Sequence, residues 1–415
     1  MRSLLIAAAF TVVGCSMSEP DVPAARQVPE TARADAAAVV LANNQFACDL
    51  YAGLASVDDN LVFSPFSIST ALAMLDAGAA GTTDAELRAA LHADALGDRL
   101  HAGYHALIDS LDIGRGFGNY ALSTADRLFG QTGFPFLPSY LTTTRQQYGA
   151  ELQPLDFRAS AESARNTINR WVAGQTAQLI PELFPAGSID TSVALVLVNA
   201  IVFKGSWSRQ FDAEATHDAP FQLADGTTVT VPTMRKLDGL PTAELPDGSG
   251  VVIDLAFKGN DLSLIVVVPT AANGLPAIEA QLSAAAISQW IASAHETIRR
   301  WELAFPKFTT KRAYQLQSAL AKRGILGAFN PGTADLSGID GQRDLSVSDA
   351  LHQAILAVDE QGGQAAAATG VTVSTTSAGG GERPFLVDRP FLFMLYDHVT
   401  GAILFLGRVV DPTRG

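Results

Sequence analysis

The sequence predicts an α+β fold in one large domain, and three observations support that prediction. Apolar residues at helical spacing dominate the first half of the chain. Strand-like apolar runs, two pairs of them separated by turn residues, dominate the second half. No Pro/Ser-rich tract, charge block or repeat divides the interior into separate units. Helices followed by sheets along one undivided chain are typical of α+β domains.

Helices are expected from apolar periodicity and from helix-start signals. One passes through residues 46–54, and a second follows Pro65. Thr83 and Glu86 are spaced as a capping box, which predicts the start of a third helix. A fourth passes through Ile168 and should end by Pro181, because proline does not continue a helix.

Strands are expected from apolar runs bounded by turn residues. Residues 193–203 are almost continuously apolar, as in a strand buried on both faces. Residues 251–257 and 262–268 flank a short polar turn and predict a hairpin. Residues 392–396 and 402–410 predict a second hairpin on the same grounds.

Composition and motifs limit the possible functions. The content of 48% hydrophobic and 17% charged residues allows a large core, and the net charge of −14 argues against a nucleic-acid partner. The chain has no Gly-x-Ser-x-Gly elbow and no phosphate loop, and His295-Glu296 lacks the second histidine of a zinc helix. We therefore expect no enzyme activity, no cofactor and no metal. Surface or structural roles are assigned to His92, His101, His105, His217, His295 and His398.

The N-terminus predicts export. Arg2 and the apolar run at residues 4–13 have the form of a signal peptide, which is too short to span a bilayer. The Gly-Cys ending at Cys15 is similar to a bacterial lipobox. We expect removal of residues 1–14, lipidation of Cys15, a flexible tether over residues 15–37 and an envelope location, with the outer membrane favoured. The alternative is an ordinary secretory peptide with an incidental cysteine and release into the extracellular space.

The segment from Asp359 to Ser377 combines the patterns of a loop and of a strand. Counted in steps of two from Gly363 to Thr375, the residues of one face are apolar or nearly so. The residues between them, on the other face, are small or polar, as in a half-buried strand. Glycine runs on both sides favour turns and mobility. A segment suited to both states suggests a conformational switch.

Several segments resemble the serpin family of protease inhibitors, and they occur in the right order. The most specific is Phe385–Leu395, which carries Asp-Arg-Pro-Phe between apolar strand residues. The others are residues 60–75, 199–211, 305–308, 334–339, 351–362 and 406–412. The resemblance covers residues 38–415 as one domain. It implies the serpin fold, with about nine helices around three β-sheets and an exposed reactive-centre loop.

The resemblance implies a suicide-type inhibitor of serine proteases. The protease cleaves the loop and stays covalently attached while the freed limb of the loop inserts as a strand into the central sheet. The implied partner is the target protease, and the inhibitor is expected to be a monomer. The alternative is a non-inhibitory serpin that acts as a cell-surface binding or carrier protein. Proline or bulky charged residues in the hinge would favour that alternative, and the hinge has none.

The same resemblance identifies the working residues of the loop. The hinge comprises Glu360, Gly362, Gly363, Ala365, Ala366, Ala367 and Ala368. Counting from Glu360 places the reactive bond at Thr376–Ser377, with protease subsite contacts at Val373, Ser374 and Thr375. The small side chain of Thr376 favours an elastase-like or subtilisin-like target. Gly363 departs from the Thr or Ser usual in inhibitory relatives, and slower insertion is the largest effect expected from it.

A polar cluster beneath the central sheet is also implied by the resemblance. Its members are Ser64, Ser67, Asn199 and His352, and Trp207 matches a tryptophan at the point where the loop enters the sheet. Because buried polar groups must be hydrogen-bonded, such a network can join two strands and re-pair when they separate. The alternatives are a core network without a gating role and plain core packing of Trp207.

Overall fold

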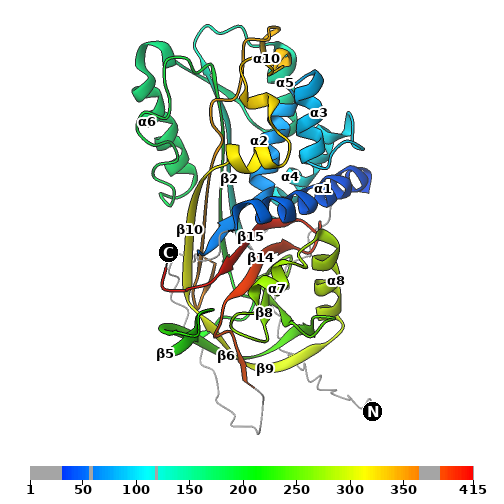
Figure 1. The fold of residues 1–415 in the computed structure, drawn as a ribbon, viewed down its shortest axis with the longest axis vertical. Helices are drawn as coiled ribbons and strands as arrows, with labels where there is room; N and C mark the ends of the chain where they lie inside the picture. The colour runs from blue at the N-terminus through cyan, green and yellow to red at the C-terminus, as the bar shows by residue number, and fades with distance from the viewer. Residues whose placement is uncertain (1–29, 56–58, 117–119, 364–383, 415) are drawn as a thin grey trace, which may run out of the picture.

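The computed structural model describes residues 30–55, 59–116, 120–363 and 384–414. These residues form two β-sheets with helices on both faces of the longer strands, so the α+β prediction is confirmed (Figure 1). The helices are α1 (Glu30–Leu54), α2 (Pro65–Asp76), α3 (Gly81–Ala90), α4 (Arg99–Gly116), α5 (Pro138–Tyr148), α6 (Phe157–Gln175), α7 (Leu275–Glu279), α8 (Ala284–His295), α9 (Gln317–Lys322), α10 (Ser337–Asp340) and the 3-10 helix Gly327–Phe329.

The six-stranded sheet has the strand order β10-β11-β12-β4-β2-β3. Its strands β4 and β11 also pair directly with each other over part of their length. The strands are β2 (Tyr120–Gln131), β3 (Leu152–Leu155), β4 (Leu195–Ser206), β10 (Phe308–Gln315), β11 (Leu351–Val358) and the two-residue β12 (Gly362–Gly363).

The nine-stranded sheet has the order β1-β15-β14-β8-β7-β6-β9-β13, and β5 also pairs with β6. Three sheets were expected in total. In the structure the second and third form one continuous sheet, because the 17-residue strand β6 runs through both. The strands are β1 (Leu61–Phe63), β5 (Asp212–Gln222), β6 (Thr228–Glu244), β7 (Gly250–Ala256), β8 (Leu262–Pro269), β9 (Ile298–Pro306), β13 (Pro384–Leu386), β14 (Phe391–Asp397) and β15 (Ile403–Val409).

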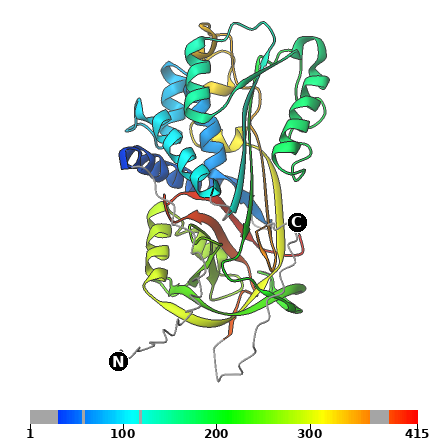
Figure 2. The same ribbon diagram turned by 180° about the vertical axis from the view of Figure 1, so that it is seen from behind.

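The six-stranded sheet separates two apolar cores. Alternation along each strand sends one set of side chains toward α6 and the other toward the main core. Val196 and Val198 of β4 pack with Ile168 and Val172 of α6, whereas Phe203 of β4 belongs to the main core. Figure 2 shows α6 on the opposite side of the long strands from α1, α2 and α4. A strand added beside this part of β4 would therefore be covered on both faces.

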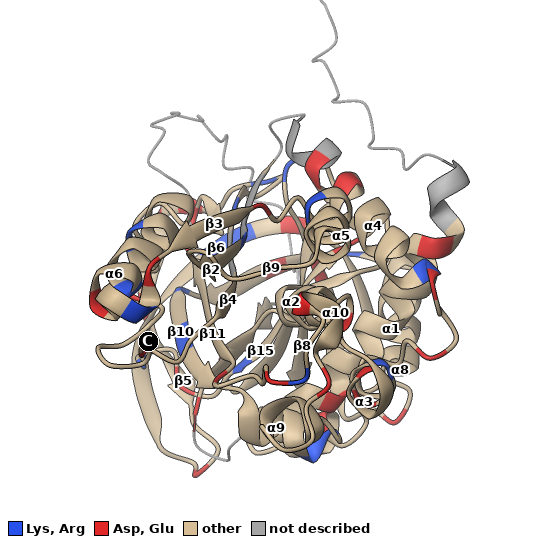
Figure 3. Cartoon of the chain, turned by 90° about the horizontal axis from the view of Figure 1, so that it is seen from above, with Lys and Arg blue, Asp and Glu red and all other residues tan. Residues whose placement is uncertain are grey.

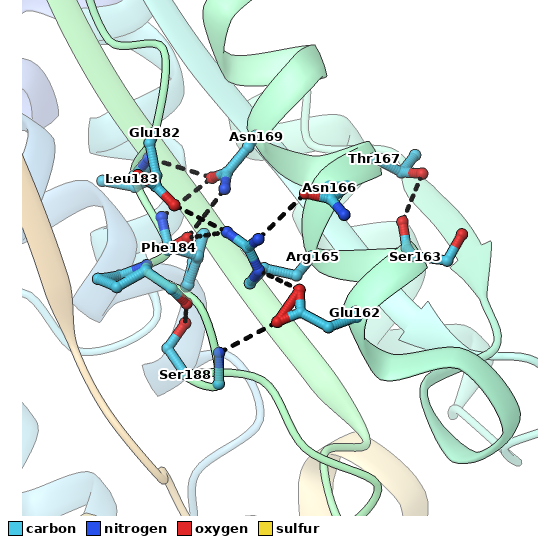
Figure 4. Close-up of polar contacts among 12 residues, drawn as sticks. Glu162, Ser163, Arg165, Asn166, Thr167, Asn169, Glu182, Leu183, Phe184 and Ser188 are labelled. Carbon is cyan, nitrogen blue, oxygen red and sulfur yellow. Dashed lines mark hydrogen bonds and ion pairs between the residues drawn. The ribbon is translucent and has the colours of Figure 1, made fainter.

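Helix α6 is fastened to the segment that leads into β4 (Figure 4). The Arg165 guanidinium contacts Glu162 at 2.5 Å and Glu182 at 2.9 Å, and it donates to the carbonyl oxygen of Phe184 at 2.7 Å. The Asn169 Oδ1 atom accepts the backbone N–H groups of Leu183 and Phe184. These bonds hold α6 against the outer face of the sheet.

Two local expectations differ from the structure. The capping-box prediction at Thr83 was wrong, because α3 begins at Gly81. The Thr83 hydroxyl instead accepts the backbone N–H of Asp335 at 2.9 Å, and Glu86 accepts that of Gly327 at 2.6 Å. Helix α1 begins at Glu30, inside the range expected as a tether, since the alanine-rich sequence there favours a helix.

Charged residues are dispersed along the helices. Figure 3 shows acidic and basic positions interspersed on the helices seen from above. Among the described residues, no helix has the length and apolar character needed to cross a membrane. Cys48 on α1 is partly buried, and burial followed by the charge of Asp49 raises its thiol pKa to about 12, which makes it unreactive.

Candidate loop hinge and sheet opening

The residues before 364 fold back on β11 in a tight turn centred on Asp359. The Asp359 N–H donates to the carbonyl oxygen of Gly362 at 3.0 Å. Its Oδ1 atom accepts the N–H groups of Gln361 at 2.9 Å and of Gly362 at 3.1 Å. The side chain of Asp359 therefore closes the turn, as Asp commonly does through its own neighbouring backbone.

This turn places β12 between β11 and β4. Gly363 pairs antiparallel with Val358 of β11 and with Gly205 of β4. Further along, β11 and β4 pair directly and parallel, with Ala354 opposite Ile201. Gly362 and Gly363 thus form a two-residue wedge that separates β11 from β4 at one end. Further along, these two strands pair directly with each other.

Glycine is required in this wedge by close backbone contacts. Gly362 has φ of +154°, and a Cβ there would lie 1.8 Å from the carbonyl oxygen of Gly205. A Cβ on Gly363 would lie 2.9 Å from the ring of Phe203. The departure from Thr or Ser at position 363 therefore has a local reason: the backbone passes directly against an aromatic ring.

Trp207 holds the turn against the end of β4. Its indole Nε1–H donates to the carbonyl oxygen of Asp359 at 2.9 Å, and its backbone N–H donates to that of Gln361 at 2.8 Å. Its ring stacks on Phe257 at a centroid distance of 4.5 Å. Trp207 therefore packs in the core and also binds the hinge backbone.

Glu360 connects the turn to strand β5 and to the junction between β9 and β10. Its carboxylate accepts from Lys307 Nζ at 2.8 and 3.1 Å and from the Thr216 hydroxyl at 2.8 Å. Partial burial opposes ionisation, but the hydrogen bonds from Lys307 and Thr216 outweigh it and lower the pKa of Glu360. The hinge carboxylate is thus charged at neutral pH and fixed on both sides.

The expected polar cluster is found in part. The Ser64 hydroxyl caps α2 by accepting the N–H of Ser67 at 3.1 Å, and the Ser64 N–H donates to His352 Nε2 at 3.1 Å. All three residues are buried. Burial lowers the pKa of His352 to about 3, so the ring is neutral and carries its proton on Nδ1. The cluster joins β11 to the start of α2.

Of the other two predicted members, only Trp207 has a described side chain. Trp207 lies at the hinge, as described above. Asn199 lies on β4 with its backbone opposite Asp126 of β2, and its side chain is outside the described part of the chain.

A cavity of about 340 Å³ adjoins the cluster. It lies beyond the end of the direct pairing between β4 and β11. Ser67, His352, Leu195 and Leu351 are among its lining residues. The Ser67 hydroxyl has no hydrogen-bond partner among the described residues, although it is buried. The sheet therefore has open space at this end of the strand pair and a wedge at the other.

The remaining predicted site residues lie outside the described residues. These are Cys15, Ala365, Ala366, Ala367, Ala368, Val373, Ser374, Thr375, Thr376 and Ser377.

The sequence analysis missed the residues that hold the hinge. Asp359, Lys307 and Thr216 carry no motif of their own. One available signal was Gly205, a glycine inside the apolar strand β4, because glycine within a strand often marks the close approach of another backbone.

Comparisons with known proteins agree with this geometry. The family model described as "Serpin (serine protease inhibitor)" matches residues 41–412. The leukocyte elastase inhibitor A of Mus musculus is 38% identical over 377 residues, which cover 89% of this chain and 98% of that protein. The leukocyte elastase inhibitor of Xenopus laevis is 40% identical over 361 residues, covering 85% and 93%.

Solved structures show the same fold. Uncleaved ovalbumin aligns with a TM-score of 0.79 at 28% identity, over 90% of this chain and 100% of that one. The family model covers nearly all of the chain, and the sheet, hinge and polar cluster are arranged as described above. The chain therefore belongs to the serpin family and is a serine protease inhibitor, not an enzyme.

Proposed function

We propose that the protein is a single-use inhibitor of elastase-like serine proteases that acts by inserting its cleaved loop into the six-stranded sheet. The observation that carries this proposal is the position of β12, which lies between β11 and β4 and is antiparallel to both. A chain continuing from Gly363 in the same register would place Ala367 between Ala354 and Ile201, which now pair directly. The hinge occupies the first two positions of that path.

Strand pairing provides the driving force. Insertion replaces one parallel pairing between β4 and β11 by two antiparallel pairings, and antiparallel pairs are slightly more stable per residue. At roughly 0.5–1.5 kcal/mol for each net hydrogen bond, about a dozen new bonds would contribute about 10 kcal/mol. Cleavage of the loop frees the limb that makes these bonds.

The side chains of the limb suit this path. A Cβ on Gly363 would point at Phe203 and Phe257 in the main core. Because alternate residues of a strand face the same side, Ala365 and Ala367 would face that core as well. Their small methyl groups fit between strands that are already packed, whereas larger side chains would require the core to move.

The target class rests on the loop sequence and on the relatives. The curated relatives described above are named leukocyte elastase inhibitors. Thr376, as the residue before the reactive bond, would underfill an aromatic pocket and could not reach an acidic pocket floor. Each such mismatch costs roughly 1–3 kcal/mol, which ranks elastase-like and subtilisin-like proteases above trypsin-like ones.

We expect elastase to form an SDS-stable complex with the protein and to cleave it at Thr376–Ser377. Mass spectrometry of the released C-terminal fragment should find Ser377 as its first residue, to within one position. Subtilisin and trypsin serve as comparison proteases, and trypsin should be inhibited more slowly. Cleavage by every protease without any stable complex would instead identify a non-inhibitory serpin.

Replacing Gly362 with Ala should impair inhibition, because the new Cβ would collide with the backbone of Gly205. We expect the hinge to leave its place between β4 and β11 and a larger fraction of the inhibitor to be consumed as substrate. The molar ratio of inhibitor to elastase needed for full inhibition measures this. Gly174→Ala on α6 is the matched control, since a Cβ there meets no atom within 4 Å. Equal ratios for the two variants would contradict the proposal.

We further propose that the protein is held at the cell envelope by a lipid on Cys15. The support is the sequence of residues 1–15 alone. Incorporation of a labelled fatty acid that is lost in Cys15→Ala would support this location. Release of unlabelled wild-type protein into the medium would indicate an ordinary secretory peptide.

A further inference from the structure

Three side chains that can bind metals converge away from the hinge and the polar cluster. Asp254 is on β7, His295 is the last residue of α8, and His398 is in the turn between β14 and β15. The Nε2 atoms of His295 and His398 lie 2.8 and 3.1 Å from the same oxygen, Oδ2 of Asp254. One ligand atom from each of the three residues lies within 4.8 Å of the other two.

These side chains line a cavity of about 490 Å³. The Asp254 side chain is 3% exposed, while those of His398 and His295 are 22% and 47% exposed. The carboxylate is therefore deeply buried, and His295 is the most accessible of the three. An entering ion would have access to all three ligand atoms and space for further ligands from solvent.

Among the described residues, the negative charge of Asp254 is not neutralised by a neighbouring cationic side chain. The Nε2 atoms of both histidines lie against its Oδ2 atom, so the carboxylate faces the ring nitrogens and not a fixed positive charge. Lys236 lines the same cavity, but its ammonium group is 2.9 Å from Asp238 and does not balance Asp254. Metal binding requires both imidazoles in the neutral form, and the three side chains then carry one net negative charge.

The donor set and the two His–Asp contacts are compatible with a known type of metal site. Two imidazole nitrogens and one carboxylate oxygen are ligands that zinc and similar divalent metals take, with a further position left for water. Metal–ligand bonds of about 2.0–2.1 Å in a tetrahedral site place ligand atoms about 3.3 Å apart. The contacts at 2.8 and 3.1 Å need to open by only a few tenths of an ångström.

We propose that Asp254, His295 and His398 form a binding site for one divalent transition metal ion of the zinc type, with a fourth position open to the cavity. The ion would join α8, β7 and the β14–β15 hairpin, which come from distant parts of the sequence. Because the site is assembled only in the folded chain, bound metal would stabilise the fold.

The test is a titration of chelator-treated, full-length protein with Zn²⁺, followed by calorimetry and by thermal unfolding. We expect one equivalent to bind and the melting temperature to rise with Zn²⁺ concentration. Co²⁺ should give the visible absorption bands of a tetrahedral nitrogen and oxygen site. His295→Gln and His398→Gln should each weaken binding roughly tenfold or more, since each removes one of three ligands.

His105→Gln is the matched control. His105 lies on α4, and its side chain is 48% exposed and 3.4 Å from Asp109, so it is also a histidine beside a carboxylate. This variant should bind Zn²⁺ like the wild type. His295 is nearly half exposed at a helix end, so its replacement should leave folding intact. The absence of saturable binding, or wild-type binding by both His295→Gln and His398→Gln, would overturn the site and leave a simple His–Asp ion-pair cluster.

Discussion

Replacing Ala367 with Arg is expected to turn the protein from an inhibitor of its target protease into a substrate. In the register continued from Gly363, this side chain enters between Ala354, which is fully buried, and Ile201. An uncompensated buried charge costs about 3–5 kcal/mol. If that cost falls on the insertion step, the step slows by roughly a hundredfold or more. The acylated protease then has time to hydrolyse the intermediate and leave.

The readout is the fraction of elastase converted to SDS-stable complex, together with the fraction of inhibitor found cleaved and free. Gln364→Arg is the matched control, because residue 364 has the opposite parity to Gly363 and would face the outer surface of the sheet. It adds the same charge to the same limb and should form complex normally. Full complex formation by Ala367→Arg would show that loop insertion is not the mechanism.

Cleavage of the loop should raise the thermal stability of the protein substantially. Among the described residues, the uncleaved sheet holds the two residues of β12 between β11 and β4, and cleavage would allow a longer strand to form. An added stability of about 10 kcal/mol corresponds to a rise in Tm of at least about 10 °C for a domain of this size. Calorimetry before and after limited proteolysis within the loop measures it.

Cleaved Ala367→Arg provides the internal control for this result. It loses the same peptide bond but should gain little stability, because its limb cannot insert. An unchanged Tm in the cleaved wild type would indicate a scaffold that does not store conformational energy. An equal gain in the variant would show that the added stability comes from another part of the molecule.

Elements with strong local patterns could be predicted from the sequence. The hairpin expected at residues 251–257 and 262–268 corresponds to β7 and β8, and the second expected hairpin corresponds to β14 and β15. Alternation, apolar runs and turn residues are local properties, so no knowledge of the fold was required. The capping box failed because Thr83 and Glu86 form their hydrogen bonds with segments far along the chain.

The hinge and the histidine cluster show the limit of sequence reasoning. Gly362 and Gly363 were expected in the hinge, but their insertion depends on Gly205 and Ser206, which only the folded sheet brings opposite them. His295 and His398 were assigned surface or structural roles because the seven histidines are spread widely and His295-Glu296 lacks the second histidine of a zinc helix. Contacts with Asp254 arise from the packing of three separate elements.

The central position of β14 has a consequence for the cleaved molecule. This strand lies between β8 and β15 in the nine-stranded sheet, and its residues Phe391 to Leu395 are buried. A cut at Thr376–Ser377 would place β14 and β15 on a separate polypeptide without removing them from the sheet. The spent inhibitor would then be an obligate heterodimer whose subunit interface is its own former core, and one subunit would carry His398 while the other carried Asp254 and His295.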